Sequence, residues 1–241
     1  MALKHQEFFR DESTRRVACY TLASLLAESL AELGYDCLAS CLSLGEDGAR
    51  LGYHCGRRRP SETELEEVRS YLTRLTRIDI ELAEVEEGLG VEDLLRGARN
   101  AMKELMRRRL HPLSTHRNEF GLLVTWWGGG LVIEGFRERI YMVGSYAATA
   151  HTHPSGACIP SHHDMDSFAM LLADGGCCAG IVSPLCMFLV SRRGPLTLED
   201  YDELLALGRR LSRVRSLGEA LEELGRRASR LKSVRVEIIA L

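Results

Sequence analysis

Four of the eight histidines of this chain lie within thirteen residues, between His151 and His163. His151 and His153 are two residues apart at the end of a predicted strand, so both imidazoles should project from one face and reach one ion. Asp164 falls in the first turn of a predicted helix, and its carboxylate can face back toward the histidines. Two imidazoles and one carboxylate give Zn²⁺ three ligands and leave a fourth position for water, which is typical of a catalytic site. The segment therefore predicts one zinc ion per chain, held at a catalytic site.

Neighbouring side chains of the same chemical types receive plainer interpretations. His162 and His163 stand at a helix start, where surface histidines are common, and we do not expect them to bind the metal directly. Cys158 should fill space in the loop between the ligands. The eight cysteines show no CxxC spacing, and buried free thiols are the preferred interpretation in a reducing compartment. The chain has one glutamine and two asparagines, a scarcity seen in thermophile proteins. Intracellular disulfides would be an alternative in a hyperthermophile.

The elements that must position these residues follow from periodicity and turn signals. Before the histidine segment we expect helices at residues 13–33, 61–75 and 91–109, the second capped by Ser61, and strands at 36–44, 49–55, 78–85, 119–125 and 131–133. From residue 140 onward we expect strands at 140–150, 179–182, 185–191 and 234–241, a helix at 161–174 capped by Ser161, and one or two helices within 198–231. The predicted fold class is α+β, with a small N-terminal α/β domain at residues 1–77 and a second domain at residues 78–241.

The ligand spacing is also that of a known family. His151-Thr-His153, seven residues, Ser161, two residues and Asp164 resembles the JAMM motif of the MPN-domain zinc metallopeptidases, of the archaeal and prokaryotic type. The resemblance covers about residues 78–191 and does not reach the first 75 residues. It implies a JAMM/MPN-like fold, similar to cytidine deaminases, in which helices flank a curved mixed sheet.

The family also carries a glutamate upstream, in a pattern resembling Glu-x-x-Gly-Leu-Leu. Here Glu119-Phe-Gly-Leu-Leu is similar but one residue shorter between the glutamate and the glycine. Glu134 and Glu138 are the alternatives, yet they leave little room before His151 for a hairpin and a returning strand. The resemblance implies that Glu119 is the general acid and base for the attacking water, and that Ser161 donates a hydrogen bond to the oxyanion.

The activity implied is hydrolysis of an isopeptide bond between a lysine and the C-terminal Gly-Gly of a ubiquitin-like modifier, as by a deubiquitinase. In archaea such a modifier is a small sulfur-carrier-like protein. One alternative is release of an amino acid such as cysteine from a sulfur-carrier protein. Another, of a different class, is a non-catalytic MPN-type scaffold or binding module. Trp126 and Trp127 precede three glycines at a predicted hairpin tip. Core packing accounts for one of them, and the other is a candidate for clamping the substrate tail or for a protein contact.

The composition of the chain indicates which classes of binding partner to expect. The formal net charge of −3 provides no overall positive field, so we expect neither nucleic acid nor an anionic membrane as a partner. No stretch approaches the roughly 20 apolar residues of a membrane span, and the first residues lack the apolar core of a signal peptide. We expect a cytoplasmic protein, in which the long amphipathic region near the C-terminus could support a homodimer.

Overall fold

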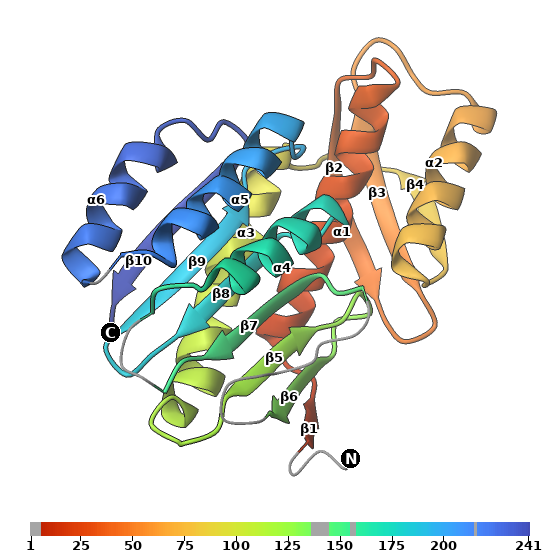
Figure 1. The fold of residues 1–241 in the computed structure, drawn as a ribbon. Coiled ribbons are helices and arrows are strands. Elements are labelled where there is room, and N and C mark those ends of the chain that lie inside the picture. Colours follow the sequence, from red (N-terminus) through yellow and green to blue (C-terminus); the bar gives the residue numbers. More distant parts are fainter. Residues whose placement is uncertain (1–5, 136–144, 155–157, 215) are drawn as a thin grey trace.

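The computed structural model describes residues 6–135, 145–154, 158–214 and 216–241. In this part of the chain it shows an α+β protein with six α-helices, a seven-stranded mixed sheet and a three-stranded sheet (Figure 1). The predicted fold class is therefore confirmed at the level of α+β. Among the described residues, no helix is long and apolar enough to cross a membrane.

The large sheet has the strand order β1-β6-β5-β7-β8-β9-β10. Its strands are β1 (Gln6–Phe9), β5 (Phe120–Val124), β6 (Gly130–Glu134), β7 (Ala148–Thr152), β8 (Cys178–Val182), β9 (Cys186–Arg192) and β10 (Val234–Ala240). All neighbours are antiparallel except β7 and β8, which run parallel and are joined through a helix. The central strands β5, β7 and β8 are buried along their whole length, so both faces of the sheet must be covered.

Helices cover the sheet on both faces (Figure 1). One face carries α4 (His162–Ala173), α5 (Leu198–Leu211) and α6 (Leu217–Ala228), whose apolar residues pack with Ile181, Phe188 and Val190. The other carries α1 (Glu12–Glu32) and α3 (Val91–Leu105), which pack with Leu122, Val124 and Ala150. Successive strand residues point to opposite faces, so the even-numbered residues of β5 and β7 face α1 and α3. Their odd-numbered residues face α4.

The three-stranded sheet lies beside α1, with the order β2-β3-β4. Its strands are β2 (Cys37–Leu44), β3 (Ala49–Cys55) and β4 (Ile80–Glu84), and α2 (Glu62–Thr76) connects β3 to β4. Ser61 caps α2 as expected, in a capping box with Glu64. Residues of this sheet and of the large sheet belong to one buried apolar cluster. The sequence-based division after residue 77 therefore separates segments that share a core.

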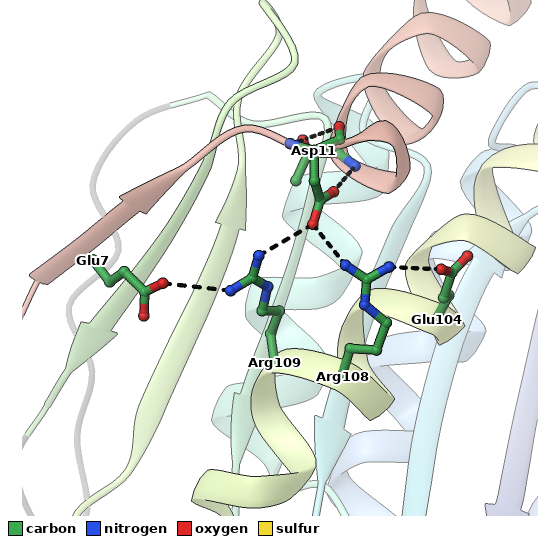
Figure 2. A network of polar contacts seen from close by, with 6 residues as sticks. Glu7, Asp11, Glu104, Arg108 and Arg109 are labelled. Atoms are coloured by element: carbon green, nitrogen blue, oxygen red, sulfur yellow. Dashed lines mark hydrogen bonds and ion pairs between the residues drawn. The ribbon is translucent and has the colours of Figure 1, made fainter.

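A network of ion pairs connects β1 and the start of α1 to the turn that follows α3 (Figure 2). Asp11 caps α1 by accepting a hydrogen bond from the Thr14 amide, and its second oxygen lies 3.1 Å from Arg108 and 3.3 Å from Arg109. Both arginines stand in a π-helical turn (Met106–Leu110) that extends α3. Arg109 also pairs with Glu7 of β1. The strand β1, which the sequence did not predict, is thus held both by β6 and by this network.

The expectation of free thiols is wrong for six of the eight cysteines. The structure has three disulfides, joining Cys19 to Cys41, Cys37 to Cys55 and Cys158 to Cys186. The first two staple α1, β2 and β3 together. The third ties the loop between the predicted ligands to β9, so Cys158 does more than fill space. Cys177 and Cys178 are free and buried.

Candidate metal centre

Two elements bring the predicted metal ligands together. His151 lies in β7, and His153 follows it with its amide donating to the carbonyl of Val182, which continues the pairing of β7 with β8. Both histidines are odd-numbered in this strand and so face α4. Ser161 caps α4, and Asp164 occupies the first turn of that helix. The C-terminal end of a central strand therefore meets the N-terminal end of the helix that covers it.

The ligand atoms converge closely. His151 Nε2 lies 3.1 Å from His153 Nε2 and 3.1 Å from Asp164 Oδ1, while His153 Nε2 lies 3.5 Å from Asp164 Oδ2. A tetrahedral Zn²⁺ with ligand bonds of about 2.0–2.1 Å holds neighbouring ligand atoms about 3.3–3.4 Å apart. These three residues form the one group among the described residues that could hold a metal ion. The donor set therefore fits zinc and supplies three of its four ligands.

The chemistry of the donors also suits a cation. With neutral imidazoles, two nitrogen lone pairs and a carboxylate would lie within about hydrogen-bond distance of one another. These electron-rich atoms repel each other unless a proton or a metal ion lies between them. Burial by itself would raise the pKa of Asp164, but its hydrogen bond with His151, the charges of both histidines and its bond with Ser161 hold that pKa well below its ordinary value. A divalent cation would act in the same direction.

A capping box orients the carboxylate ligand. Asp164 Oδ2 accepts a hydrogen bond of 2.7 Å from the Ser161 amide, and the Asp164 amide donates to Ser161 Oγ at 3.2 Å. The ligand is therefore fixed by the same bonds that begin α4. Since the Ser161 hydroxyl is an acceptor in this motif, its own proton is left to donate.

Strand alternation separates the candidate bases. The amide of Gly135 donates to the carbonyl of Glu119, which continues the pairing of β5 with β6 one residue beyond Phe120. Glu119 is odd-numbered and lies two residues before Gly121, the partner of His151 in β7. By alternation its side chain belongs to the face that carries the ligands.

Glu134 lies on the opposite face of the sheet from the ligands, in β6, which is one strand further from β7 than β5 is. It pairs with Phe120 across β5 and β6, and it accepts a hydrogen bond of 2.6 Å from Asn118. The strand β6 is not adjacent to β7, because β5 lies between them. These placements favour Glu119 as the base. The third candidate, Glu138, lies outside the described residues.

The other histidines and the tryptophans singled out in the sequence do not belong to the three-ligand group. His162 and His163 are exposed, with ring centroids 3.8 Å apart. Trp126 is buried, and its indole nitrogen donates to Ser145 Oγ. Trp127 is half-buried and contacts Phe8 of β1. Both tryptophans follow the end of β5 that is opposite the metal ligands, roughly 14 Å along the strand. The structure thus brings neither of them to the candidate metal centre.

Two residues that the sequence did not single out help to set the geometry. The hydroxyl of Thr152, between the two histidines, accepts a hydrogen bond of 2.9 Å from the Phe120 amide and so ties β7 to the residue after Glu119. Phe168 of α4 is buried, with its ring centroid 6.0 Å from that of His151. Its spacing of four residues from Asp164 placed it on the same face of the helix, which was the available signal.

Comparisons of the chain with protein-family models, with curated proteins and with solved structures gave no match.

Proposed function

We propose that this chain is a zinc-dependent isopeptidase of the JAMM type, which cleaves a ubiquitin-like modifier after its C-terminal Gly-Gly from a lysine. The observation that supports this most strongly is the convergence of His151, His153 and Asp164 at distances that suit one zinc ion. The order of these residues, with Ser161 as the cap of α4, supports the JAMM/MPN-like interpretation of the fold. The proposed location is the cytoplasm, and a chain with three disulfides there fits a hyperthermophilic source.

The metal site itself has a defined role in this proposal. A bound Zn²⁺ would act as a Lewis acid toward the scissile carbonyl and would lower the pKa of a coordinated water. Asp164 and the two histidines would hold the ion, and the capping box keeps the carboxylate in place. The side chains of His153 and Asp164 are 16% and 18% exposed, so the centre can be reached from solvent.

The chain's own residues would carry the proton transfers and stabilise the developing charge. Glu119 would accept a proton from the attacking water and pass it to the leaving lysine amine as the carbon–nitrogen bond breaks. Water thus contributes a hydroxyl to the carbonyl carbon and a proton to the amine. Ser161 would donate its hydroxyl proton to the oxyanion of the tetrahedral intermediate. A Gly-Gly tail suits such a site because glycine lets the backbone approach closely.

Metal analysis of the purified chain tests the foundation of the proposal. We expect one zinc per chain in the wild type, much less in His153→Ala, and an unchanged content in His163→Ala, which alters an exposed neighbour at the same helix end. Equal zinc in both variants, or none in the wild type, would remove the metal centre and with it the peptidase.

Cleavage assays then identify the reaction. A modifier joined through Gly-Gly to a lysine side chain should be cut, and the cut should require zinc. Cleavage of an α-linked cysteine adduct alone would favour the alternative, amino-acid release from a sulfur-carrier protein. Bound zinc with neither activity would contradict both reactions and favour the non-catalytic scaffold.

A further inference from the structure

A cavity unrelated to the metal centre lies at the other end of α4. It has a volume of about 480 Å³, within the range of small-molecule sites, and lies where α1, α2, α4 and the start of α5 meet. Leu25, Leu172 and Leu196 supply apolar walls. The polar side chains that line it are Glu28, Glu32, Tyr71, Arg192 and Tyr201.

One carboxylate of this cavity is buried and incompletely paired. The side chain of Glu28 is 8% exposed, and its Oε2 is paired with the guanidinium of Arg192, whose side chain is 3% exposed. Arg192 also donates to the carbonyls of Gly175 and Gly194. Glu28 Oε1 is buried and has no hydrogen-bond partner within the described part of the chain. A buried charged group with an unsatisfied acceptor is costly, so a positive charge held close to the Glu28 carboxylate would be favourable.

The charged side chains and aromatic rings around the cavity indicate which type of ligand it would bind. Glu28 and Glu32 are four residues apart on α1 and so share one helix face. Their two negative charges exceed the single positive charge of Arg192. Two tyrosine rings, Tyr71 and Tyr201, line the same space, and aromatic faces attract cations. Carboxylates, aromatic rings and apolar walls together suit an organic cation with an aliphatic body.

We propose that this cavity binds a primary alkylammonium group, either a free aliphatic amine or the lysine side chain of another molecule. The ammonium is attracted by the carboxylates of Glu28 and, at the rim, of Glu32, and its aliphatic chain lies against the leucines and the tyrosine rings. The proposal is independent of the metal centre, which lies at the N-terminal end of α4.

The titration behaviour of Glu28 agrees with this. Burial raises the pKa of Glu28 above its ordinary value despite the lowering effect of Arg192, so the carboxylate is under-stabilised in the free protein. A bound cation would supply the missing stabilisation.

The test is a titration of the full chain with n-butylammonium, followed by amide chemical shifts. Weak binding should perturb the amides of Leu172 and Gly175, and n-butanol, which has the same number of heavy atoms but no charge, should bind at least about tenfold more weakly. Equal affinity for the amine and the alcohol, or shifts confined to other regions, would overturn the proposal.

Variants separate this site from general attraction of cations. Glu28→Gln should abolish binding. Because that change leaves Arg192 with a neutral partner and can weaken the fold, the decisive variant is Glu32→Gln at the exposed rim. It should weaken binding by about two- to fivefold. Glu222→Gln, on the exposed face of α6, is the matched control and should change nothing. Equal affinities in Glu32→Gln and Glu222→Gln would contradict the proposed site.

Two further experiments identify the source of the ammonium group and test whether binding depends on a metal ion. Nα-acetyl-lysine amide carries the same group on a peptide unit. Tighter binding of this compound than of n-butylammonium indicates a protein lysine, and the reverse order indicates a free amine. Treatment of the chain with a chelator should leave the affinity unchanged. Loss of binding on chelation would show that the amine occupies the metal centre instead.

Discussion

At the scale of single residues, the alternation of β5 distinguishes the two described glutamates that could serve as the base. Glu119 and Glu134 are similar by sequence, since each is followed within two residues by a glycine and lies near strand-forming segments. In the structure they belong to opposite faces of the sheet, and only Glu119 shares the face of His151.

Glu119→Gln should lower kcat for isopeptide cleavage by about 10²- to 10⁴-fold, the usual contribution of a general acid–base group. Zinc content should stay at the wild-type level, because Glu119 is not a ligand. Glu134→Gln removes a charge on the other face and should change kcat by less than about twofold. Steady-state kinetics with zinc analysis of both variants gives the answer. A larger loss in Glu134→Gln would show that the one-residue shortening of the Glu119 segment has moved the base.

Ser161 has two roles that a control on another helix can separate. Ser161→Ala should lose the cap of α4, at a cost of about 1 kcal/mol in the free energy of unfolding, and should lower kcat by about 10²-fold through loss of the oxyanion donor. Ser61 caps α2 in an equivalent capping box. Ser61→Ala should therefore cost a similar free energy with no effect on kcat. Chemical denaturation and kinetics of the two variants distinguish the roles, and equal kcat in both would leave Ser161 as a cap alone.

At the scale of elements, the sequence predicted those parts of the fold whose signals are local. Three such signals each lie within a short stretch of sequence. They are the helical periodicity before Gly34, the capping sequence at Ser61, and the spacing of His151, Ser161 and Asp164. For that reason α1, α2, α4 and the three-ligand group were predicted from the sequence. The predicted strand at 140–150 overlaps β7 at residues 148–150. Residues 140–144 lie outside the described part of the chain.

Features that depend on distant partners could not be predicted in the same way. The strand β1 has four residues without apolar alternation, and its partner β6 lies more than 120 residues away. The disulfide partners Cys158 and Cys186 are 28 residues apart and meet only because β9 lies near the ligand loop. The cavity at Glu28 likewise combines four helices and a strand. The spacing of residues in the sequence does not indicate which of these distant segments come into contact.

The disulfide between Cys158 and Cys186 should affect the metal centre as well as stability. Removing it by Cys158→Ser with Cys186→Ser should cost about 3–4 kcal/mol in the loop-closure estimate and lower zinc retention, because the loop between the ligands loses its tether. Cys19→Ser with Cys41→Ser should cost a similar free energy and leave the zinc content unchanged. Thermal unfolding and metal analysis compare the pairs.

A thiol count establishes the oxidised state on which that comparison depends. The denatured, unreduced chain should show two reactive thiols, Cys177 and Cys178, and the reduced chain eight. Eight thiols without reduction would restore the sequence-based expectation of free cysteines.

At the scale of the whole molecule, residues 6–77 are part of the structural support of the sheet that carries the candidate metal centre. Val17, Leu22 and Leu26 of α1 are fully buried, in a cluster that also contains apolar residues of α3, β5 and β7. The pairing of β1 with β6 and the ion pairs of Asp11 with Arg108 and Arg109 add further connections. A division into independent domains at residue 77 would expose this face of the sheet to water.

A fragment of residues 78–241 should therefore fail to fold cooperatively, since removing α1 uncovers the apolar face of α3 and of the central strands. We expect broad thermal unfolding and a tendency to aggregate. A chain of residues 6–241, which keeps β1, the Asp11 network and the whole of α1, is the matched control and should unfold as the full chain does. Circular dichroism melting with zinc analysis of both proteins provides the measurement. If the 78–241 fragment melts sharply and binds one zinc, residues 1–77 are an appended domain, and the contacts of α1 with the large sheet are dispensable for the metal centre.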